Sequence, residues 1–276
     1  MVNSLKDTIM LHNGVEMPSF GLGVYKMEDP QEAENAVKHA IEYGYRSIDT
    51  AHIYRNEESV GRAVRESGVP RNELFITTKV WNDDQGYDSA LKAFEHSLNE
   101  LNTDYIDLYL IHWPVKPKYL ETWRALERLY DEKAVRAIGV SNFQIHHLED
   151  LAANANEKPV INQVELHPRL TQEPLREYCK EHGIAVEAWS PIGRGRLLDE
   201  PTLNHIAAKH GKTSVQVILR WHLQIGNVVI PKSVRPERIR ENADIFDFEL
   251  SLSEMNEISS LNMNERFGSH PDKFNF

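Results

Sequence analysis

The sequence alternates between short apolar stretches and amphipathic stretches along almost its whole length. Eight stretches have the pattern of strands, and each precedes a stretch with the spacing of a helix. The expected strands are 20–24, 47–49, 74–79, 105–112, 135–140, 160–164, 184–188 and 228–230. Strict alternation of this kind is typical of a parallel sheet covered by helices. Eight such units favour a (β/α)8 TIM barrel.

The expected helices cover 30–43, 57–66, 89–100, 120–131, 145–153, 174–182, a region within 201–224, and 236–242. Before the first strand, Asn13-Gly14 lies between two short apolar runs, and this dipeptide is typical of a tight hairpin turn. We therefore expect a short N-terminal β-hairpin that acts as a lid. The chain has no linker or low-complexity segment, so we expect a single domain over residues 1–276.

A doubly wound sheet is the main structural alternative. Its phosphate-binding fingerprint, Gly-x-Gly-x-x-Gly after the first strand, is absent. Gly21 and Gly23 are followed by Lys26 where the third glycine would stand, and the later pair Gly193 and Gly195 by Leu198. The barrel is therefore the better prediction.

The balance of charges limits the possible partners. The chain has 31 Lys and Arg against 42 Asp and Glu, a formal net charge of −11. No basic excess exists to neutralise nucleic-acid phosphates, so we expect neither a nucleic-acid nor a membrane partner. The single cysteine, Cys179, excludes an internal disulfide framework and indicates the cytoplasm. No extended apolar patch is evident from the periodicity, so we expect a monomer.

Four residues that can take part in proton transfer lie at or shortly after the ends of expected strands. Asp49, Lys79 and His112 end three neighbouring strands, and Tyr54 follows Asp49 by five residues. Taken singly, each has an ordinary alternative: a helix cap, a solvated lysine, a core histidine and a packing tyrosine. In a barrel, however, the carboxyl ends of the strands converge on the active site. Together these residues indicate a site that moves protons.

The combination suits the reduction of a carbonyl group. A tyrosine hydroxyl has a pKa of about 10 in water, and a nearby ammonium group should lower it. A carboxylate would hold the lysine, and a histidine would orient the carbonyl oxygen. Such a site can protonate a developing alkoxide. Since no side chain supplies hydride, a nicotinamide cofactor is implied.

Several longer motifs resemble those of the aldo-keto reductase family. They are Gly44-Tyr45-Arg46-Ser47-Ile48-Asp49-Thr50-Ala51 with Tyr54, the strand through Lys79, Ile111-His112-Trp113-Pro114, Ile138-Gly139-Val140-Ser141-Asn142-Phe143, and Ile230-Pro231-Lys232-Ser233. They span most of the chain. Within that family, the chain is most similar to bacterial glyoxal/methylglyoxal reductases, through Gln163-Val164-Glu165-Leu166-His167-Pro168 and Ala188-Trp189-Ser190-Pro191.

The resemblance implies a role for each catalytic candidate. Tyr54 would be the general acid, Lys79 would lower its pKa, Asp49 would pair with Lys79, and His112 would position the substrate carbonyl. Residues implied in binding the cofactor are Val24, Tyr25, Asp49, Ser141, Asn142, Gln163, Trp189, Ser190, Ile192, Arg194, Lys232, Ser233, Val234, Arg238, Glu241 and Asn242. Residues implied in binding the substrate are Tyr25, Tyr54, Trp81, His112 and Trp113.

Particular parts of the cofactor are expected at particular residues. Ser141, Asn142 and Gln163 would bond the nicotinamide amide, and Trp189 would stack on the ring. The basic segment 232–242 would bind the adenosine end, with Lys232 and Arg238 on a 2′-phosphate. We therefore expect NADPH/NADP+ as the cofactor. Without the resemblance, a solvated helix start would be the more ordinary interpretation of this segment. Arg194, expected over the pyrophosphate, could instead lie on a mobile loop.

The substrate is less well defined by the sequence. Aromatic walls favour apolar or planar carbonyl compounds. The loops after Trp113 and Leu261 are short, which suggests an open pocket. Such a pocket would accept aromatic aldehydes and small α-oxoaldehydes such as methylglyoxal and glyoxal. Phe267 and the tail 271–276 can fold over the mouth or merely pack.

Three alternatives remain open. The chain could be a reductase of one defined ketone, or a non-enzymatic protein that binds the cofactor. It could also be a metal-dependent hydrolase using His112, His167 and Asp49, but close ligand pairs are missing, so we expect no bound metal.

Overall fold

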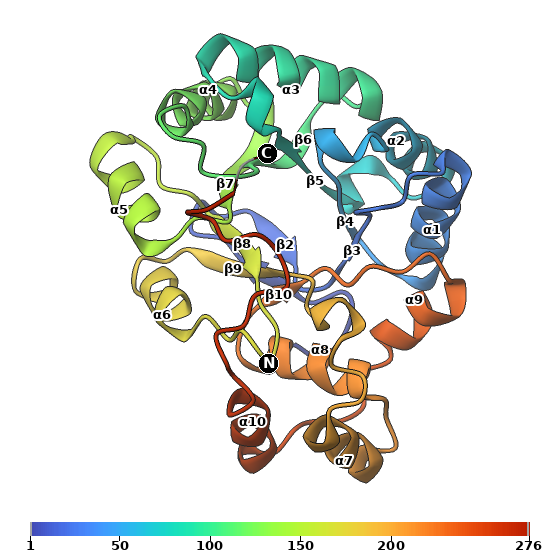
Figure 1. The fold of residues 1–276 in the computed structure, drawn as a ribbon. Coiled ribbons are helices and arrows are strands. Elements are labelled where there is room, and N and C mark those ends of the chain that lie inside the picture. The colour runs from blue at the N-terminus through green and yellow to red at the C-terminus, as the bar shows by residue number, and fades with distance from the viewer. Residues whose placement is uncertain (1, 275) are drawn as a thin grey trace.

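Eight parallel strands follow one another around a ring with helices outside it (Figure 1), in a computed structural model that describes residues 2–274 and 276. The strands are β3 (Gly21–Gly23), β4 (Ser47–Asp49), β5 (Phe75–Val80), β6 (Ile106–Ile111), β7 (Val135–Ser141), β8 (Ile161–Glu165), β9 (Ala185–Trp189) and β10 (Val228–Val229). A parallel bridge between Phe20 and Val229 joins the last strand to the first. The predicted (β/α)8 barrel is confirmed.

The helices form the outer layer of the barrel (Figure 1). They are α1 (Pro30–Tyr43), α2 (Glu57–Glu66), α3 (Tyr87–Leu101), α4 (Tyr119–Asp131), α5 (Ile145–Asn154), α6 (Glu173–Glu181), α7 (Pro201–His210), α8 (Ser214–Gln224), α9 (Pro236–Ala243) and α10 (Leu252–Ser259). The region expected to be helical within 201–224 contains two helices. Gly211 ends α7 in the left-handed conformation, with φ 64°, and Thr213 caps α8. The sequence analysis missed α10, which begins at a capping box of Ser251 and Glu254.

The N-terminal hairpin closes the end of the barrel opposite to the active site. Its strands are β1 (Thr8–Met10) and β2 (Glu16–Pro18). Leu11 and Met17 pack on residues from the amino-terminal halves of several barrel strands, including Phe75 and Leu108. The expected lid is therefore a plug beneath the barrel. In its turn, only Gly14 has a positive φ, 84°, because the loop has three residues rather than two.

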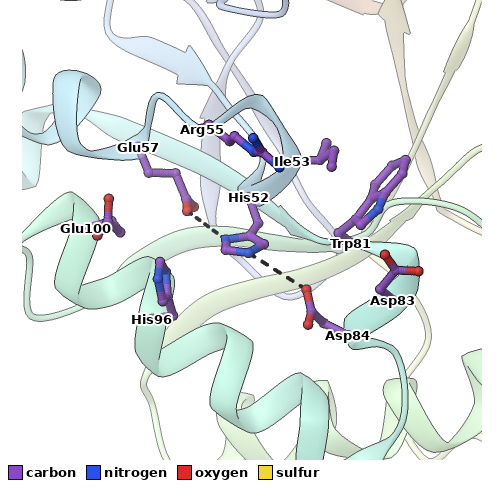
Figure 2. A pocket seen from close by; sticks show the side chains of 9 residues that line it. All are labelled: His52, Ile53, Arg55, Glu57, Trp81, Asp83, Asp84, His96 and Glu100. Atoms are coloured by element: carbon purple, nitrogen blue, oxygen red, sulfur yellow. Dashed lines mark hydrogen bonds and ion pairs between the residues drawn. The ribbon is translucent and has the colours of Figure 1, made fainter. Parts of the chain in front are cut away.

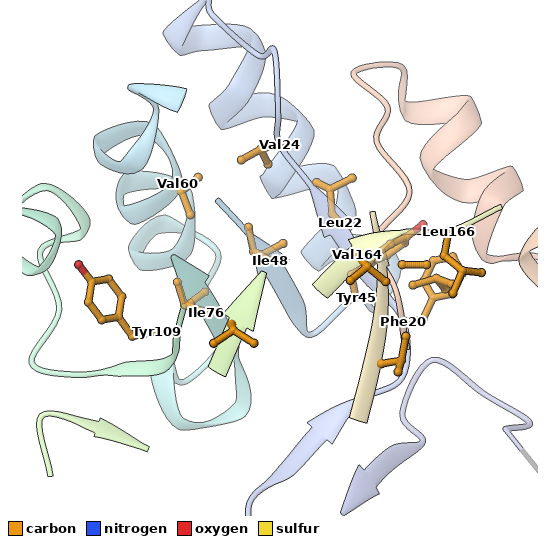
Figure 3. Packing of buried hydrophobic residues seen from close by; sticks show 14 of the residues in the cluster. Phe20, Leu22, Val24, Tyr45, Ile48, Val60, Ile76, Tyr109, Val164 and Leu166 are labelled. Carbon is orange, nitrogen blue, oxygen red and sulfur yellow. The ribbon is translucent and has the colours of Figure 1, made fainter. Parts of the chain in front are cut away.

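Alternation along the strands places the functional side chains. Ile48 and Ile76 face outward and join the apolar layer beneath the helices (Figure 3). Their neighbours Asp49 and Thr77 therefore face the barrel axis, and so does Lys79, two residues beyond Thr77. The inward positions near the carboxyl ends thus carry polar groups, while the outward positions stabilise the fold by apolar burial.

Within residues 2–274 and 276, no helix has both the length and the apolar character that crossing a bilayer requires.

Candidate active site

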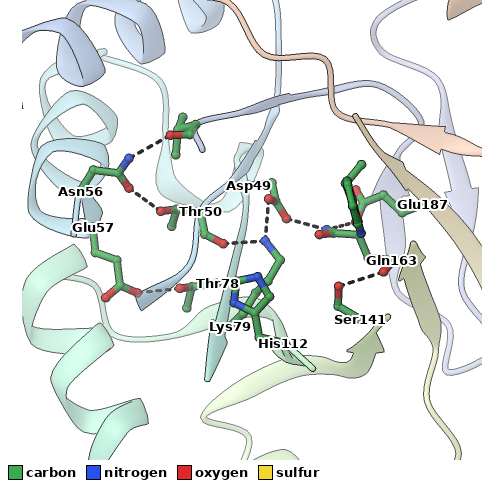
Figure 4. A network of polar contacts seen from close by, with 12 residues as sticks. Asp49, Thr50, Asn56, Glu57, Thr78, Lys79, His112, Ser141, Gln163 and Glu187 are labelled. Atoms are coloured by element: carbon green, nitrogen blue, oxygen red, sulfur yellow. Dashed lines mark hydrogen bonds and ion pairs between the residues drawn. The ribbon is translucent and has the colours of Figure 1, made fainter. Parts of the chain in front are cut away.

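A buried ion pair lies at the centre of the carboxyl-terminal end of the barrel. Lys79 Nζ donates to Asp49 Oδ1 at 2.6 Å and to the carbonyl oxygen of Thr50 at 2.8 Å (Figure 4). The exposed fractions of Lys79 and Asp49 are 0% and 3%. A buried pair is tolerated only when further hydrogen bonds satisfy it. Gln163 Nε2 provides one, donating to Asp49 Oδ2 at 2.8 Å.

A second carboxyl group, Glu187, lies beside this pair and was not expected from the sequence. Gln163 Nε2 also donates to Glu187 Oε2, at 2.6 Å (Figure 4). Burial, reinforced by the Asp49 carboxylate, raises the pKa of Glu187 to about 8. Glu187 Oε1 is buried and has no partner among the described residues. At neutral pH the barrel interior thus holds a protonated Glu187 carboxyl group beside the Asp49–Lys79 pair.

Tyr54 ends the short helix η1 (His52–Tyr54), directly above the ion pair. Its ring packs against Tyr25 and His112, with centroid separations of 5.0 and 5.7 Å. Lys79 Nζ lies 5.3 Å from the centroid of the Tyr54 ring. The ammonium group is therefore close to the phenol, while its hydrogen bonds go to Asp49 and Thr50.

The net shift of the Tyr54 pKa is opposite to the expected direction. Burial raises the pKa of the Tyr54 hydroxyl well above 10, and the Asp49 carboxylate raises it further. Lys79 is paired with Asp49 at 2.6 Å, and its charge does not reverse this shift. The consequence is that Tyr54 carries its proton throughout the physiological pH range.

His112 follows β6 and lines the same cleft as Tyr54. Burial holds the pKa of its imidazole well below 6.5, and the positive charge of Lys79 acts in the same direction. The ring is therefore neutral and carries one N–H. Asn142 Nδ2 donates to the main-chain oxygen of His112 at 2.9 Å and so fixes this segment. A neutral imidazole can donate a hydrogen bond to a carbonyl oxygen.

A cleft of about 1290 Å³ opens above these residues. It exceeds the usual size of a site for one small molecule and has room for a dinucleotide together with a small substrate. Of the residues expected to bind cofactor or substrate, the cleft is lined by Tyr25, Asp49, Tyr54, Trp81, His112, Trp113, Ser141, Asn142, Gln163, Trp189, Ser190, Ile192, Arg194, Lys232, Ser233, Val234, Arg238, Glu241 and Asn242. Val24 is fully buried and is not among the lining residues.

The residues expected to bind the nicotinamide amide form hydrogen bonds with one another and with Trp189. Ser141 Oγ donates to the main-chain oxygen of Gln163 at 2.8 Å, and Trp189 Nε1 donates to Asn142 Oδ1 at 2.9 Å. Asn142 and Ser190 both have positive φ, at 65° and 48°. Such conformations are uncommon for residues other than glycine, although asparagine adopts them more readily than most, and they often mark functional sites. They occur where β7 and β9 end at the cleft.

The far end of the cleft is strongly basic although the chain is acidic. Arg194, Lys232, Arg235 and Arg238 all line it, and none forms an ion pair in the part of the chain that the structure describes. The last three lie at or just before the first turn of α9, whose amino terminus also favours anions. These features fit a ligand with several phosphate groups.

The C-terminal tail narrows the other end of the cleft. Phe276 stacks on Trp81 with ring centroids 5.8 Å apart, and its edge meets Trp113 at 5.2 Å. Asn82 Nδ2 donates to the main-chain oxygen of Phe276 at 3.0 Å. The pocket expected to be open is therefore partly covered by aromatic residues from the tail.

Glu165 anchors the start of this tail. Its Oε1 accepts hydrogen bonds from the main-chain nitrogens of Phe267 and Gly268, at 2.6 and 3.0 Å. Gly268 packs so closely on the Trp189 indole that an added Cβ would lie 2.4 Å from Trp189 Cη2. The tail thus helps to hold the ring expected to stack on the cofactor.

The sequence analysis missed several residues that line the cleft. Thr213, Ser214 and Val215, at the beginning of α8, form part of its wall, as does Leu198. The capping box at Thr213 marks this helix start in the sequence. Its position beside the cleft depends on how α8 packs, which no local pattern indicates.

Comparison with known proteins identifies the family. The profile described as Aldo/keto reductase family matches residues 19–263. Glyoxal reductase of Bacillus subtilis (strain 168) is 63% identical, with 100% of each chain covered. Methylglyoxal reductase DkgA of Escherichia coli (strain K12) is 47% identical, covering 96% of this chain and 97% of that protein.

Solved structures agree with this result. The crystal structure of an aspartate-to-alanine mutant of Gox0644 in complex with NADPH has a TM-score of 0.94 and 45% identity, covering 98% of this chain and 99% of that one. The likeness extends over the whole barrel. The chain therefore belongs to the aldo/keto reductase family.

Proposed function

We propose that the protein uses NADPH to reduce small α-oxoaldehydes, such as methylglyoxal and glyoxal, and aromatic aldehydes to alcohols. The observation that carries the proposal is the placement of protonated Tyr54 and neutral His112 above the Asp49–Lys79 pair, in a cleft whose far end is basic. The names of the relatives, glyoxal reductase and methylglyoxal reductase, support the choice of substrate.

The cations at the basic end of the cleft are the residues that would hold the cofactor phosphates. Lys232 and Arg238 would contact the 2′-phosphate, the guanidinium by a planar fork. Arg194 would contact the pyrophosphate, and Trp189 would lie against the nicotinamide ring. When bound, the cofactor supplies the hydride. The complexes of structural neighbours with NADPH and NADP support this assignment.

Tyr54 would donate the proton to the developing alkoxide. Its raised pKa ensures that the hydroxyl is protonated when substrate arrives. Lys79, 5.3 Å from the ring centroid, would stabilise the phenolate as it forms. His112 would direct its single N–H to the substrate oxygen and hold that oxygen near the tyrosine hydroxyl. Asp49 would keep the ammonium group of Lys79 in position.

The aromatic end of the cleft would select the substrate. Trp81, Trp113 and Phe276 surround it with ring faces and exclude water from the reacting oxygen. Because Phe276 covers part of this end, small aldehydes fit with less rearrangement than large ketones. This favours α-oxoaldehydes.

NADPH consumption by purified protein tests the proposal. Methylglyoxal, glyoxal, an aromatic aldehyde and a bulky ketone would each be supplied with NADPH or with NADH. We expect the highest kcat/KM for an aldehyde with NADPH. Binding of NADPH without consumption in the presence of any carbonyl compound would contradict the proposal and favour a non-enzymatic, cofactor-binding protein.

A further inference from the structure

A smaller pocket of about 360 Å³ lies next to the active-site cleft. Ile53 and Trp81 line both spaces and form the wall between them. The other side of the small pocket carries polar groups, and Figure 2 shows His52, Glu57 and His96 directed toward one another. None of these three side chains has a part in the proposed reduction.

We propose that this pocket is a binding site for a transition-metal dication of the Zn²⁺ class, and that the bound ion lowers the turnover of the reductase. Two imidazoles and one carboxylate are a ligand set that such ions prefer, whereas Mg²⁺ and Ca²⁺ prefer oxygen ligands alone.

The distances between the candidate ligand atoms suit one ion. The ligand atoms of His52, Glu57 and His96 all lie within 4.8 Å of one another. His52 Nδ1 is 3.4 Å from Glu57 Oε2. Zinc bonds of about 2.0–2.2 Å place two ligand atoms of a tetrahedral site about 3.3 Å apart. His52 and Glu57 therefore already have the required separation, and a ligand atom of His96 on α3 lies within 4.8 Å of both.

The Glu57 carboxylate is held in place by a neighbouring side chain. Glu57 is buried at the first residue of α2. Thr78 Oγ1 donates to its Oε1 at 2.6 Å, which leaves Oε2 toward His52 (Figure 4). An outer hydrogen bond of this kind orients a metal ligand.

His52 also has an outer partner. While Nδ1 faces Glu57, its Nε2 faces Asp84 Oδ2 at 3.8 Å (Figure 2). In many zinc sites a carboxylate accepts the second N–H of a ligating histidine and fixes its tautomer. Asp84 is placed for this role after a small shift of its half-exposed side chain.

The charge of the pocket also favours a cation. Carboxylates from Glu57, Asp83, Asp84 and Glu100 line it, against the single guanidinium of Arg55. Several carboxylates around a small pocket raise the local concentration of cations.

The site is connected to the catalytic residue through η1. His52 and Tyr54 are the first and last residues of this three-residue turn. An ion that ties His52 to His96 on α3 would draw the turn toward α3 and displace the Tyr54 hydroxyl. A displacement of about 1 Å in a reacting group can cost roughly a hundredfold in rate. Bound Zn²⁺ should therefore lower kcat. This effect rests on the proposed carbonyl reduction, whereas binding of the ion does not.

Zn²⁺ affinity measured by competition with a chromophoric chelator tests the site. The wild-type protein should bind one ion at this pocket, and His96→Ala should weaken that binding by at least about tenfold, since it removes one of three ligands. Mg²⁺ at the same concentration should not compete. His205→Ala, at an exposed histidine elsewhere, is the matched control and should retain wild-type affinity.

A second cluster provides the decisive comparison. His146, His147 and Asp272 also lie within metal-ligand distance of one another. If His146→Ala abolished Zn²⁺ binding while His96→Ala left it unchanged, the ion would belong there and the proposal would be overturned. Absence of binding to the wild-type protein would also overturn it and leave His52 and Glu57 as an ordinary ion pair.

Turnover measurements then test the effect on the reaction. Saturating Zn²⁺ should lower kcat in the wild-type protein and leave His96→Ala unaffected, while the two proteins have equal activity without metal. Binding that depends on His96 but leaves kcat unchanged would refute the link to Tyr54. If the wild type reduced no carbonyl compound at all, the proposed function would fail, and the chelator competition would still report on the site.

Discussion

Replacing Glu187 with glutamine should remove a pH-dependent loss of stability. The pKa of this carboxyl group is raised from 4.5 to about 8 by burial and by Asp49. An acid whose pKa is raised in the folded protein ionises at lower pH in the unfolded chain than in the folded one. Its contribution to stability is therefore complete below the pKa of the unfolded chain and is lost as the pH rises through the pKa of the folded protein. The wild-type protein should therefore become less stable between about pH 5 and pH 8.

The magnitude follows from the size of the shift. Each pKa unit corresponds to about 1.4 kcal/mol, so the loss of unfolding free energy between about pH 5 and pH 8 is roughly 4 kcal/mol. In Glu187→Gln the side chain cannot ionise, and its amide oxygen can still accept from Gln163 Nε2, which now lies 2.6 Å from Glu187 Oε2. The variant should thus gain stability relative to the wild type as pH increases.

Urea denaturation at several pH values would measure this difference. The free energies of unfolding of wild type and Glu187→Gln should diverge by roughly 4 kcal/mol toward pH 8. Glu121→Gln, at an exposed position of α4, is the control and should follow the wild-type slope. Parallel curves for wild type and Glu187→Gln would show that the buried carboxyl group is ionised and would refute the reasoning.

Further predictions concern the two ends of the cleft. Arg238→Ala should raise the KM for NADPH by roughly tenfold or more and leave the KM for NADH nearly unchanged, since a charge-assisted bond to phosphate is lost; equal effects on both cofactors would contradict the assignment. Gly268→Ala should lower the unfolding free energy by about 1–3 kcal/mol, because its Cβ would overlap the Trp189 indole; urea denaturation would show it, and wild-type stability would mean that the tail is not held in this way. Phe276→Ala should raise kcat/KM for aromatic aldehydes relative to methylglyoxal, since the stack on Trp81 is removed; an unchanged ratio would place the tail outside the substrate path.

Most of the barrel could be predicted from the sequence because its signals are local and repeated. Each strand and helix has its own periodicity, and Pro30 and Gly44 mark the ends of α1 at the expected residues. Strand order then follows from the rule that sequential parallel strands lie side by side. The end of α7 was missed because Gly211 and Thr213 interrupt a pattern that is apolar on both sides.

The buried polar centre was predictable only in part. Asp49, Lys79 and His112 could be found because their strands end at one known place in a barrel. Glu187 was missed because a glutamate in a short strand resembles an exposed alternate position. Its outward neighbours Val186 and Ala188 are the signal that it faces the axis.

The electrostatic state of Tyr54 could not be obtained from the sequence. Residue types indicate which charges are available. The pKa of Tyr54, however, depends on its desolvation and on the distances of Asp49 and Lys79 from its ring. The position of Phe276 is equally non-local, since it depends on Glu165 anchoring the tail far along the chain.

The most direct test of the proposed reaction is the rate of methylglyoxal reduction by Tyr54→Phe with saturating NADPH. Loss of a general acid should reduce kcat by roughly a hundredfold or more, while NADPH affinity stays near that of the wild type. Tyr43→Phe, at an exposed tyrosine that ends α1, should retain wild-type kcat. Full activity of Tyr54→Phe would contradict the central claim that this hydroxyl supplies the proton.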